Sequence, residues 1–199
     1  MKKYGIIYAD PPWAYRNKHC EGSALAHYNT MRLEDICNLP VKKIAAQDCV
    51  LFLWTTYPML PEALRVIEAW GFKYKTIGFA WIKQNRKADS LYMGTGYWTR
   101  ANSEVCLLAI KGKPKRISAS VHSVIVSHIR EHSKKPDEAR QRIVELMGDL
   151  PRIELFARQK ADGGMYGATK LIVISNLRRL EHESTYSLRG IAKGMLCVP

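Results

Sequence analysis

The sequence predicts an α/β fold in which a mostly parallel sheet carries helices on both faces. Short apolar runs typical of strands alternate with helix-like segments along most of the chain, an order that favours parallel strands. Cys49 to Thr55 is a continuous apolar run, which is typical of a strand covered on both faces. The 199 residues, of which 47% are hydrophobic and 25% charged, suffice for one domain with a core.

The first half of the chain predicts three strands and two helices. The run that begins at Tyr4 stops abruptly at Asp10-Pro11-Pro12, which marks the end of a buried strand. The second helix has Pro61 at its start and Gly71 directly after its end. The strands are expected over Tyr4 to Ala9, Cys49 to Thr55 and Thr76 to Ile82, and the helices over Glu34 to Leu39 and Pro61 to Trp70.

The second half begins with a long polar loop, expected from Asn85 to Ala101, and then returns to the alternating pattern. Its helix opens with acidic residues, which suit the positive end of the helix dipole. Strands are expected over Glu104 to Ile110 and Arg152 to Phe156, with the helix over Pro136 to Met147. After Gly167 the pattern weakens, although Leu171 to Ile174 could form a strand. We therefore predict a domain in residues 1–170 and a tail of uncertain order in residues 171–199.

The composition favours a polyanionic partner. Lys and Arg number 31 against 18 Asp and Glu, a net charge of +13, and each phosphate neutralised by such residues releases counterions. The alternative is a basic surface that only keeps the protein soluble. The five cysteines form no C-x-x-C pair, so neither a zinc site nor a disulfide framework is indicated. No signal peptide or membrane-spanning run is apparent, and we expect a soluble, cytoplasmic protein.

Asp10-Pro11-Pro12-Trp13 is the first candidate site, because ligands bind at the carboxyl ends of strands in such sheets. The Asp10 carboxylate can accept one hydrogen of an amino group. Pro11 precedes another proline and is therefore extended, which leaves its carbonyl outside any helix and able to accept the second hydrogen. Trp13 offers a flat face on which a base could stack. The alternative is a strand that ends in a proline-rich turn with a packed tryptophan.

A second group of residues interleaves aromatic and basic side chains. Such a mixture suits a nucleotide that is flipped or single-stranded, with phosphates beside it. The alternative is that the aromatic residues pack in the core and the basic residues are solvated. No metal-binding pattern such as H-E-x-x-H and no G-x-S-x-G nucleophile string is present. The candidate substrate-binding residues are Tyr15, Tyr28, Trp81, Lys83, Trp98 and Arg100.

The sequence resembles the adenine-N6 methyltransferases that carry an Asp-Pro-Pro-Trp motif, a family that includes the eukaryotic messenger-RNA adenosine methyltransferase and bacterial and phage DNA enzymes. The resemblance extends from about Tyr4 to Gly167. It rests on ordered strings, which together are far more specific than any one of them. In chain order these strings are YADPPW, HYNTM, LFLWTT, WIKQN, GYWTRANSE, HSKKPDE and IELFAR.

The resemblance implies a Rossmann-like fold that binds S-adenosylmethionine, with the catalytic and cofactor motifs in circularly permuted order. It implies that Asp10, Pro11, Pro12 and Trp13 are catalytic and that Tyr28 lines the acceptor pocket. It places Asp10, Lys135, Phe156 and Arg158 at the cofactor, where an ammonium could bind a carboxylate or orient the base. The alternative for Lys135 is a solvated basic residue before a helix that Ser133 caps.

One departure from the family lies at Ala168. Members usually carry Gly-Asn-Glu or Gly-Asn-Gln here, with polar side chains that meet the cofactor, whereas this chain reads Tyr166-Gly167-Ala168-Thr169. Alanine cannot make those hydrogen bonds.

We expect an enzyme that methylates the exocyclic N6 amino group of adenine in DNA, since a compact chain without an accessory RNA-binding domain is similar to the prokaryotic and phage members. Two alternatives remain open: an RNA adenine-N6 methyltransferase, and a catalytically weak, nucleic-acid-binding partner subunit of the same fold. The expected partners are S-adenosylmethionine and nucleic acid, without a metal or a membrane. A homodimer is also compatible with the resemblance.

Overall fold

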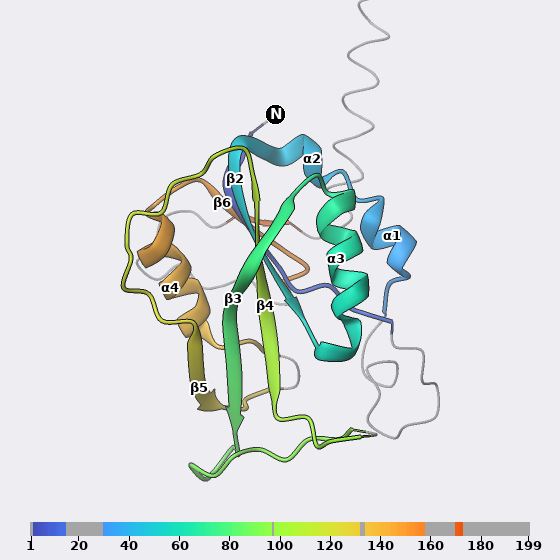
Figure 1. Cartoon of the computed structure of the whole chain (residues 1–199), viewed down its shortest axis with the longest axis vertical. Coiled ribbons are helices and arrows are strands. Elements are labelled where there is room, and N and C mark those ends of the chain that lie inside the picture. Colours follow the sequence, from blue (N-terminus) through green and yellow to red (C-terminus); the bar gives the residue numbers. More distant parts are fainter. Residues whose placement is uncertain (1, 15–29, 97, 132–133, 158–169, 173–199) are drawn as a thin grey trace, which may run out of the picture.

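The computed structural model describes residues 2–14, 30–96, 98–131, 134–157 and 170–172. These residues form a sheet of seven strands in the order β5-β3-β4-β2-β1-β6-β7 (Figure 1). The strands are β1 (Tyr4–Ala9), β2 (Ala45–Thr55), β3 (Lys73–Gln84), β4 (Ser103–Lys111), β5 (Val124–His128), β6 (Arg152–Leu155) and β7 (Lys170–Ile172).

The sheet is mostly parallel, as predicted. β1 pairs in parallel with β2 and β6, β6 with β7, and β3 with β5. Only β4 runs antiparallel to its neighbours β2 and β3. The described residues between β3 and β4 contain no helix, and the chain enters β4 in the opposite direction, beside β3.

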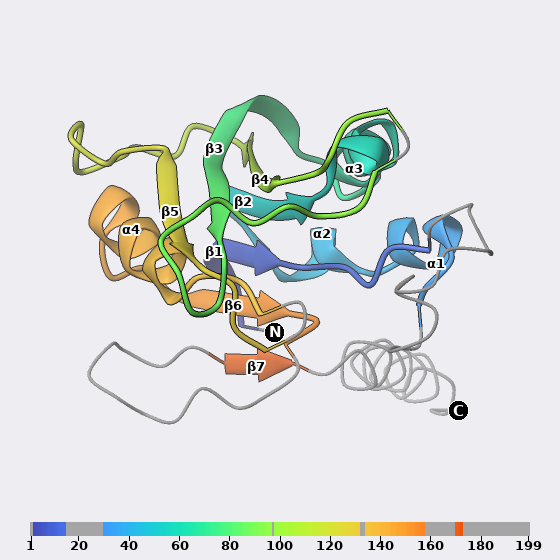
Figure 2. The ribbon, with the colours of Figure 1, turned by 90° about the horizontal axis from the view of Figure 1, so that it is seen from below.

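Helices cover both faces of the sheet, which confirms the second part of the predicted fold. Figure 2 shows α1 and α3 on one side of the sheet and α4 on the other. Strand β2 separates two apolar cores, because its successive side chains point to opposite faces. Leu51 and Leu53 pack in the core beneath α1 and α3, whereas Phe52 and Trp54 pack beneath α4. The helices are α1 (Leu33–Cys37), α2 (Val41–Ile44), the 3-10 turn η2 (Tyr57–Met59), α3 (Leu60–Ala69) and α4 (Asp137–Met147).

The predicted end of α3 at Gly71 has a clear cause in the backbone. Gly71 has a φ of +77°, a conformation that glycine adopts without steric penalty. The backbone N–H groups of Gly71 and Phe72 donate to the Glu68 and Ile67 carbonyls, at 2.8 and 3.0 Å, and so close the last turn. None of the helices described is long and apolar enough to cross a membrane.

The structure adds three elements that the sequence did not predict, α2, η2 and β5. β5 lies at the edge of the sheet, and its apolar residues alternate between the exposed Val124 and Val126 and the buried Ile125. The uncertain strand near Leu171 is present as β7, so the domain boundary predicted at residue 170 falls inside a strand. Residues 173–199 of the predicted tail lie outside the described residues.

Candidate active site

Asp10 lies at the carboxyl edge of the sheet, between two neighbouring strands. It follows Ala9, the last residue of β1, which pairs with Leu53 of β2 and with Leu155 of β6. Its side chain is 23% exposed, so the carboxylate remains open to a ligand. The sequence predicted this position from the abrupt end of the first strand, and the structure places Asp10 where ligands bind in sheets of this kind.

Lys135 connects Asp10 to a second carboxylate, Glu104. Its Nζ lies 2.8 Å from Asp10 Oδ2 and 3.3 Å from Glu104 Oε2. Glu104 stands near the start of β4 and also pairs with Lys83, whose Nζ lies 2.5 Å from Oε1. Two ammonium and two carboxylate groups therefore alternate in the order Lys83, Glu104, Lys135, Asp10.

The charges in this row stabilise one another in a buried place. Burial disfavours the ammonium of Lys135, but the neighbouring Asp10 and Glu104 carboxylates outweigh it and hold the pKa of Lys135 above its ordinary value. Burial likewise disfavours the charged form of Glu104, yet Lys135 and Lys83 hold the pKa of Glu104 below its ordinary value. Both groups are thus charged near neutral pH.

An aromatic wall backs the Lys135 ammonium. Its Nζ lies 5.7 Å from the centre of the Trp54 ring, within the range of a cation–π interaction. Trp54 Nε1 in turn donates to Tyr8 Oη at 2.6 Å. Burial raises the pKa of Tyr8 well above its ordinary value, so this phenol stays neutral. The wall fixes the side of the site that faces α4.

Ion pairs attach α4 and the segment before it to the sheet. Arg130 donates to the Lys135 carbonyl at 3.2 Å and pairs with Asp137 at 2.6 Å, so it holds the backbone at Lys135. Arg140 binds both carboxylate oxygens of Glu154 on β6, at 2.9 and 2.7 Å. The side chain of Lys135 is 7% exposed, and these contacts account for its fixed position.

The Pro-Pro-Trp segment forms a tight turn after Asp10. The Pro11 carbonyl accepts the Trp13 N–H at 2.9 Å, and the Pro12 carbonyl accepts the Met31 N–H at the same distance. The sequence suggested that the Pro11 carbonyl could accept a hydrogen from a ligand. In the structure it already accepts one hydrogen bond, but a carbonyl oxygen has a second lone pair that can accept another. The Met31 contact ties the turn to the segment that leads into α1.

Trp13 packs against the core, so its stacking role stays a prediction. Its side chain is 6% exposed, and its Nε1 donates to the Trp54 carbonyl at 3.1 Å. Trp13 belongs to the apolar core beneath α1 and α3. Its burial agrees with the alternative interpretation, a packed tryptophan after a strand.

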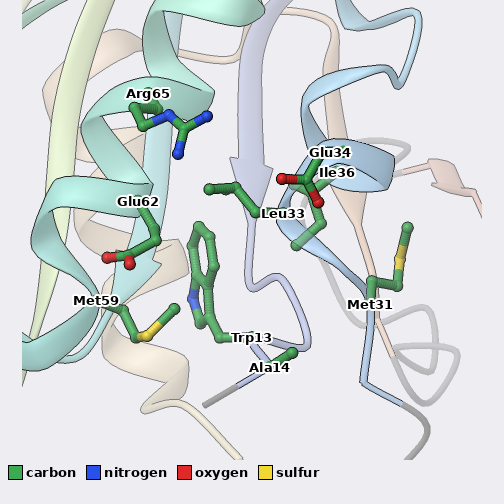
Figure 3. Close-up of a pocket in the computed structure, with 9 residues that line it drawn as sticks. All are labelled: Trp13, Ala14, Met31, Leu33, Glu34, Ile36, Met59, Glu62 and Arg65. Atoms are coloured by element: carbon green, nitrogen blue, oxygen red, sulfur yellow. The ribbon is translucent and has the colours of Figure 1, made fainter. Parts of the chain in front are cut away.

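A pocket of about 200 Å³ lies beside Trp13, between the segments that carry α1 and α3 (Figure 3). Neither Lys135 nor Glu104 lines it, so it is distinct from the row of charges. Its lining residues are Trp13, Ala14, Met31, Leu33, Glu34, Ile36, Met59, Glu62 and Arg65. Among the residues that the structure describes, no group of three or more His, Cys, Asp or Glu side chains could hold a metal ion.

The family model of MT-A70 matches residues 4–166, which include every strand described above except β7. The chain belongs to the MT-A70 family. This confirms the resemblance drawn from the ordered strings.

Relatives of known name support the same family. The chain is 35% identical to the type II methyltransferase M.MunI of Mycoplasma sp, over 81% of this chain and 75% of that protein. It is 33% identical to the N(6)-adenosine-methyltransferase MT-A70-like of Arabidopsis thaliana, over 78% of this chain. It is 31% identical to the human N(6)-adenosine-methyltransferase catalytic subunit METTL3, over 79% of this chain. The matches cover only 22% and 26% of these two eukaryotic proteins.

Two of the predicted cofactor residues of this MT-A70 chain, Asp10 and Phe156, fall at adjacent strand ends. Phe156 directly follows Leu155, the partner of Ala9, so Phe156 and Asp10 occupy equivalent places on neighbouring strands. Phe156 also has a φ of +66°, which is rare for a residue with a side chain and turns the backbone sharply at the strand end. Arg158 lies outside the described residues.

The predicted substrate residues divide into two groups. Trp81 is buried and donates to Ser127 Oγ at 2.9 Å, and Lys83 pairs with Glu104. The burial of Trp81 agrees with the alternative of core packing, and a substrate role for either residue stays a prediction. Trp98 is 91% exposed and Arg100 is also exposed, so both are open to a nucleotide. Tyr15 and Tyr28 lie outside the described residues.

Glu104 is the site residue that the sequence analysis did not single out. It is the last residue of GYWTRANSE, one of the strings that identify the MT-A70 resemblance. That string begins in a polar loop, and its glutamate stands at the start of an apolar strand. A charged residue is ordinary at such a boundary, so nothing in the sequence marked it as functional. Only the antiparallel return of β4 brings Glu104 to the edge that Lys135 occupies.

Proposed function

We propose that this chain transfers a methyl group to the exocyclic N6 amino group of adenine in DNA. The observation that carries the proposal is the position of Asp10, which stands at the carboxyl edge of the sheet beside Lys135 and Glu104. Family membership supports the reaction type, because the relatives' names describe a type II methyltransferase and N(6)-adenosine methyltransferases.

The adenine amino group is a poor nucleophile, because its lone pair is delocalised into the ring. The Asp10 carboxylate can accept one of its hydrogens, and the second lone pair of the Pro11 carbonyl can accept the other. Two acceptors orient the nitrogen and favour its pyramidal form. Lys135 holds the Asp10 carboxylate in place through Oδ2, while Glu104 holds Lys135. Positioning and the exclusion of water supply most of the rate in such a transfer.

We infer that S-adenosylmethionine is the methyl donor, and when bound it supplies a methyl group already activated on a sulfonium. The residues that would hold it are Asp10, Lys135 and Phe156, with Arg158. The donor set fits such a group, since a buried ammonium, a carboxylate and an aromatic residue stand at one edge. An ammonium suits the carboxylate of the donor, and an aromatic ring suits its adenine.

Calorimetric titration with S-adenosylmethionine tests the donor. Saturable binding to the wild-type chain is expected. Absence of binding would favour the alternative of a catalytically weak partner subunit. Ala168 favours that alternative too, because alanine cannot make the hydrogen bonds expected at this position.

DNA is the proposed acceptor because the match spans 75% of M.MunI but only about a quarter of the eukaryotic relatives. The rest of those longer proteins has no counterpart in the aligned part of this chain. RNA is the second candidate. Methyl transfer to matched DNA and RNA oligonucleotides would distinguish the two acceptors, since a DNA methyltransferase should transfer the methyl group faster to DNA.

A tritiated-methyl transfer assay tests the role of Asp10. We expect Asp10→Ala to lose transfer to both single- and double-stranded substrates while the fold remains intact. Asp35→Ala is the matched control, since Asp35 is a half-buried aspartate on α1, away from Lys135 and Glu104. Equal activity in Asp10→Ala and the wild type would refute the proposed mechanism.

A further inference from the structure

Lysines gather at the amino edge of the sheet, opposite the edge that carries Asp10. In Figure 1 the N-terminus, α2 and the start of β2 lie together at the top, and β3 and β5 point to the bottom. We name these lysines the amino-edge cluster. Its members are Lys2, Lys3, Lys42, Lys43, Lys73, Lys111 and Lys113.

The first contacts of the amino-edge cluster join the N-terminus, α2 and the start of β3. Lys3 Nζ donates to the Lys43 carbonyl at 2.7 Å, which ties the residues before β1 to α2. The Lys42 side chain lies against the turn that leads into β3, since a Cβ atom at Gly71 would be 2.9 Å from Lys42 Cε. Lys73 is the first residue of β3, two positions after that turn.

Further contacts extend the amino-edge cluster to the end of β4. Lys73 pairs with Ile110, the neighbour of Lys111. Lys111 pairs with Cys49, and the Lys113 N–H donates to Asp48 Oδ1 at 2.7 Å. Asp48 and Cys49 are neighbours on β2, so lysines from four segments meet at one edge.

The amino-edge cluster is strongly positive at the surface. Every member except the half-buried Lys111 is exposed. The carboxylates in the same segments are few: Asp48 accepts a backbone N–H, Glu68 lies in the last turn of α3, and Asp149 pairs with Arg152. Exposed ammonium groups in such excess suit a row of phosphates. They provide point charges without base-reading geometry, so contact with a nucleic-acid backbone would be independent of sequence.

The amino-edge cluster lies at the far end of β1 from Asp10. β1 has six residues, which at about 3.3 Å per residue separate its two ends by roughly 20 Å. A phosphate bound at the amino edge would therefore lie about six base pairs or more from the adenine at Asp10, outside the nucleotide that is methylated. We propose that the amino-edge cluster is a second DNA-binding surface, which holds duplex backbone away from the nucleotide that is methylated. This inference rests on the proposed function for the identity of the polyanion.

Salt-dependent binding to a long DNA duplex of random sequence tests the inference, with the full chain and without a methyl donor. The test variant is Lys42→Gln/Lys73→Gln, and the matched control is Arg32→Gln/Arg65→Gln, which removes two exposed charges from α3 and the start of α1. If each lysine contacts one phosphate, the slope of log Kobs against log salt falls by about 1.8 in the test variant. The control should keep the wild-type slope.

Methyl transfer to a short single-stranded oligonucleotide, measured in a single turnover, is expected to stay at the wild-type rate in Lys42→Gln/Lys73→Gln. An unchanged salt slope in that variant would overturn the inference. Binding to vesicles of phosphatidylserine is measured in parallel, and a variant that loses vesicle binding but keeps duplex binding would also overturn it. A wild-type chain that binds duplex with the expected slope but methylates nothing would refute the proposed function without refuting the role of the amino-edge cluster in DNA binding.

Discussion

At the scale of single residues, Glu104 determines how two lysines are arranged around Asp10. It contacts Lys83 through Oε1 and Lys135 through Oε2, so one carboxylate sets the positions of both ammonium groups. Asp10 alone would leave Lys135 with a single carboxylate partner. We therefore assign Glu104 a positioning role, since it acts on the substrate only through Lys135.

Glu104→Gln tests this role with little change of shape. The amide carries no charge, so Lys135 and Lys83 lose their shared partner, and unfolding should become easier by about 1–3 kcal/mol. Methyl transfer should fall roughly 10- to 100-fold because Lys135 no longer orients Asp10. Thermal melts and single-turnover rates measure the two effects, and Glu145→Gln, an exposed glutamate on α4, is the control. Wild-type rates in Glu104→Gln would contradict the assignment.

The lowered pKa of Glu104 predicts an acid-dependent loss of stability. Its burial opposes the charged form, but Lys135 and Lys83 outweigh it and lower the pKa below the ordinary value of 4.5. A group whose pKa is depressed on folding stabilises the fold above its unfolded pKa, and this stabilisation is lost as pH falls through the folded pKa. Denaturant unfolding between about pH 6 and pH 3 should show the wild type losing stability more steeply than Glu104→Gln. Parallel curves would show that Glu104 contributes nothing to this dependence.

Local strings in the sequence identified Asp10 and Lys135, but not the contacts of the aromatic residues. Asp10 ends a strand and Lys135 precedes a helix, and both features are visible along the chain. Trp13 and Trp81 are aromatic residues near functional strings, which is compatible with stacking on a base or with packing in a core. Only the folded arrangement shows that Trp54 and Ser127 accept their indole N–H groups.

At the scale of elements, α4 is fixed to the sheet through polar as well as apolar contacts. Ala139, Ile143 and Met147 enter the core beneath it. Beside them Arg140 binds Glu154 on β6 through two hydrogen bonds and lies over the Tyr8 ring at 5.3 Å. Because Lys135 lies two residues before the first residue of α4, the position of this helix also positions the edge that carries Asp10.

A double-mutant cycle on Arg140 and Glu154 measures that polar contact. Arg140→Met should destabilise the chain by about 3 kcal/mol, because it leaves the Glu154 carboxylate, whose side chain is 9% exposed, without its guanidinium. Arg140→Met/Glu154→Met should recover most of the loss. Lys134→Met, which breaks an exposed pair with Glu131, should cost less than about 1 kcal/mol. If the effects of Arg140→Met and Glu154→Met add up to the effect of the double variant, the two residues are not coupled.

Most elements were predictable because each has its own periodicity and boundaries. β2 and α3 are examples, since one is a continuous apolar run and the other lies between a proline and a glycine. β5 was missed because two of its apolar residues are exposed at a sheet edge and its neighbours are polar. The direction of β4 depends on how the chain returns through the long loop, a long-range property that no local pattern contains.

At the scale of the whole molecule, β7 bears on where the domain ends toward the C-terminus. The family match ends at residue 166, and the sequence placed the boundary at residue 170. The structure nevertheless adds β7 to the sheet, where Lys170, Leu171 and Ile172 pair with Ile153, Glu154 and Leu155. β6 carries Phe156 at its end, so β7 supports the strand that leads into the candidate cofactor site.

Two shortened chains decide where the domain ends. A chain of residues 1–169 lacks β7, which leaves β6 as an edge strand with its backbone groups exposed, and its melting temperature should fall by roughly 5 °C. A chain of residues 1–175 keeps β7 and should melt with the full chain, since we predict that the domain ends close to that strand. Differential scanning calorimetry compares the three. If residues 1–169 melt with the full chain, β7 adds no stability; if residues 1–175 melt earlier, the C-terminal segment belongs to the domain.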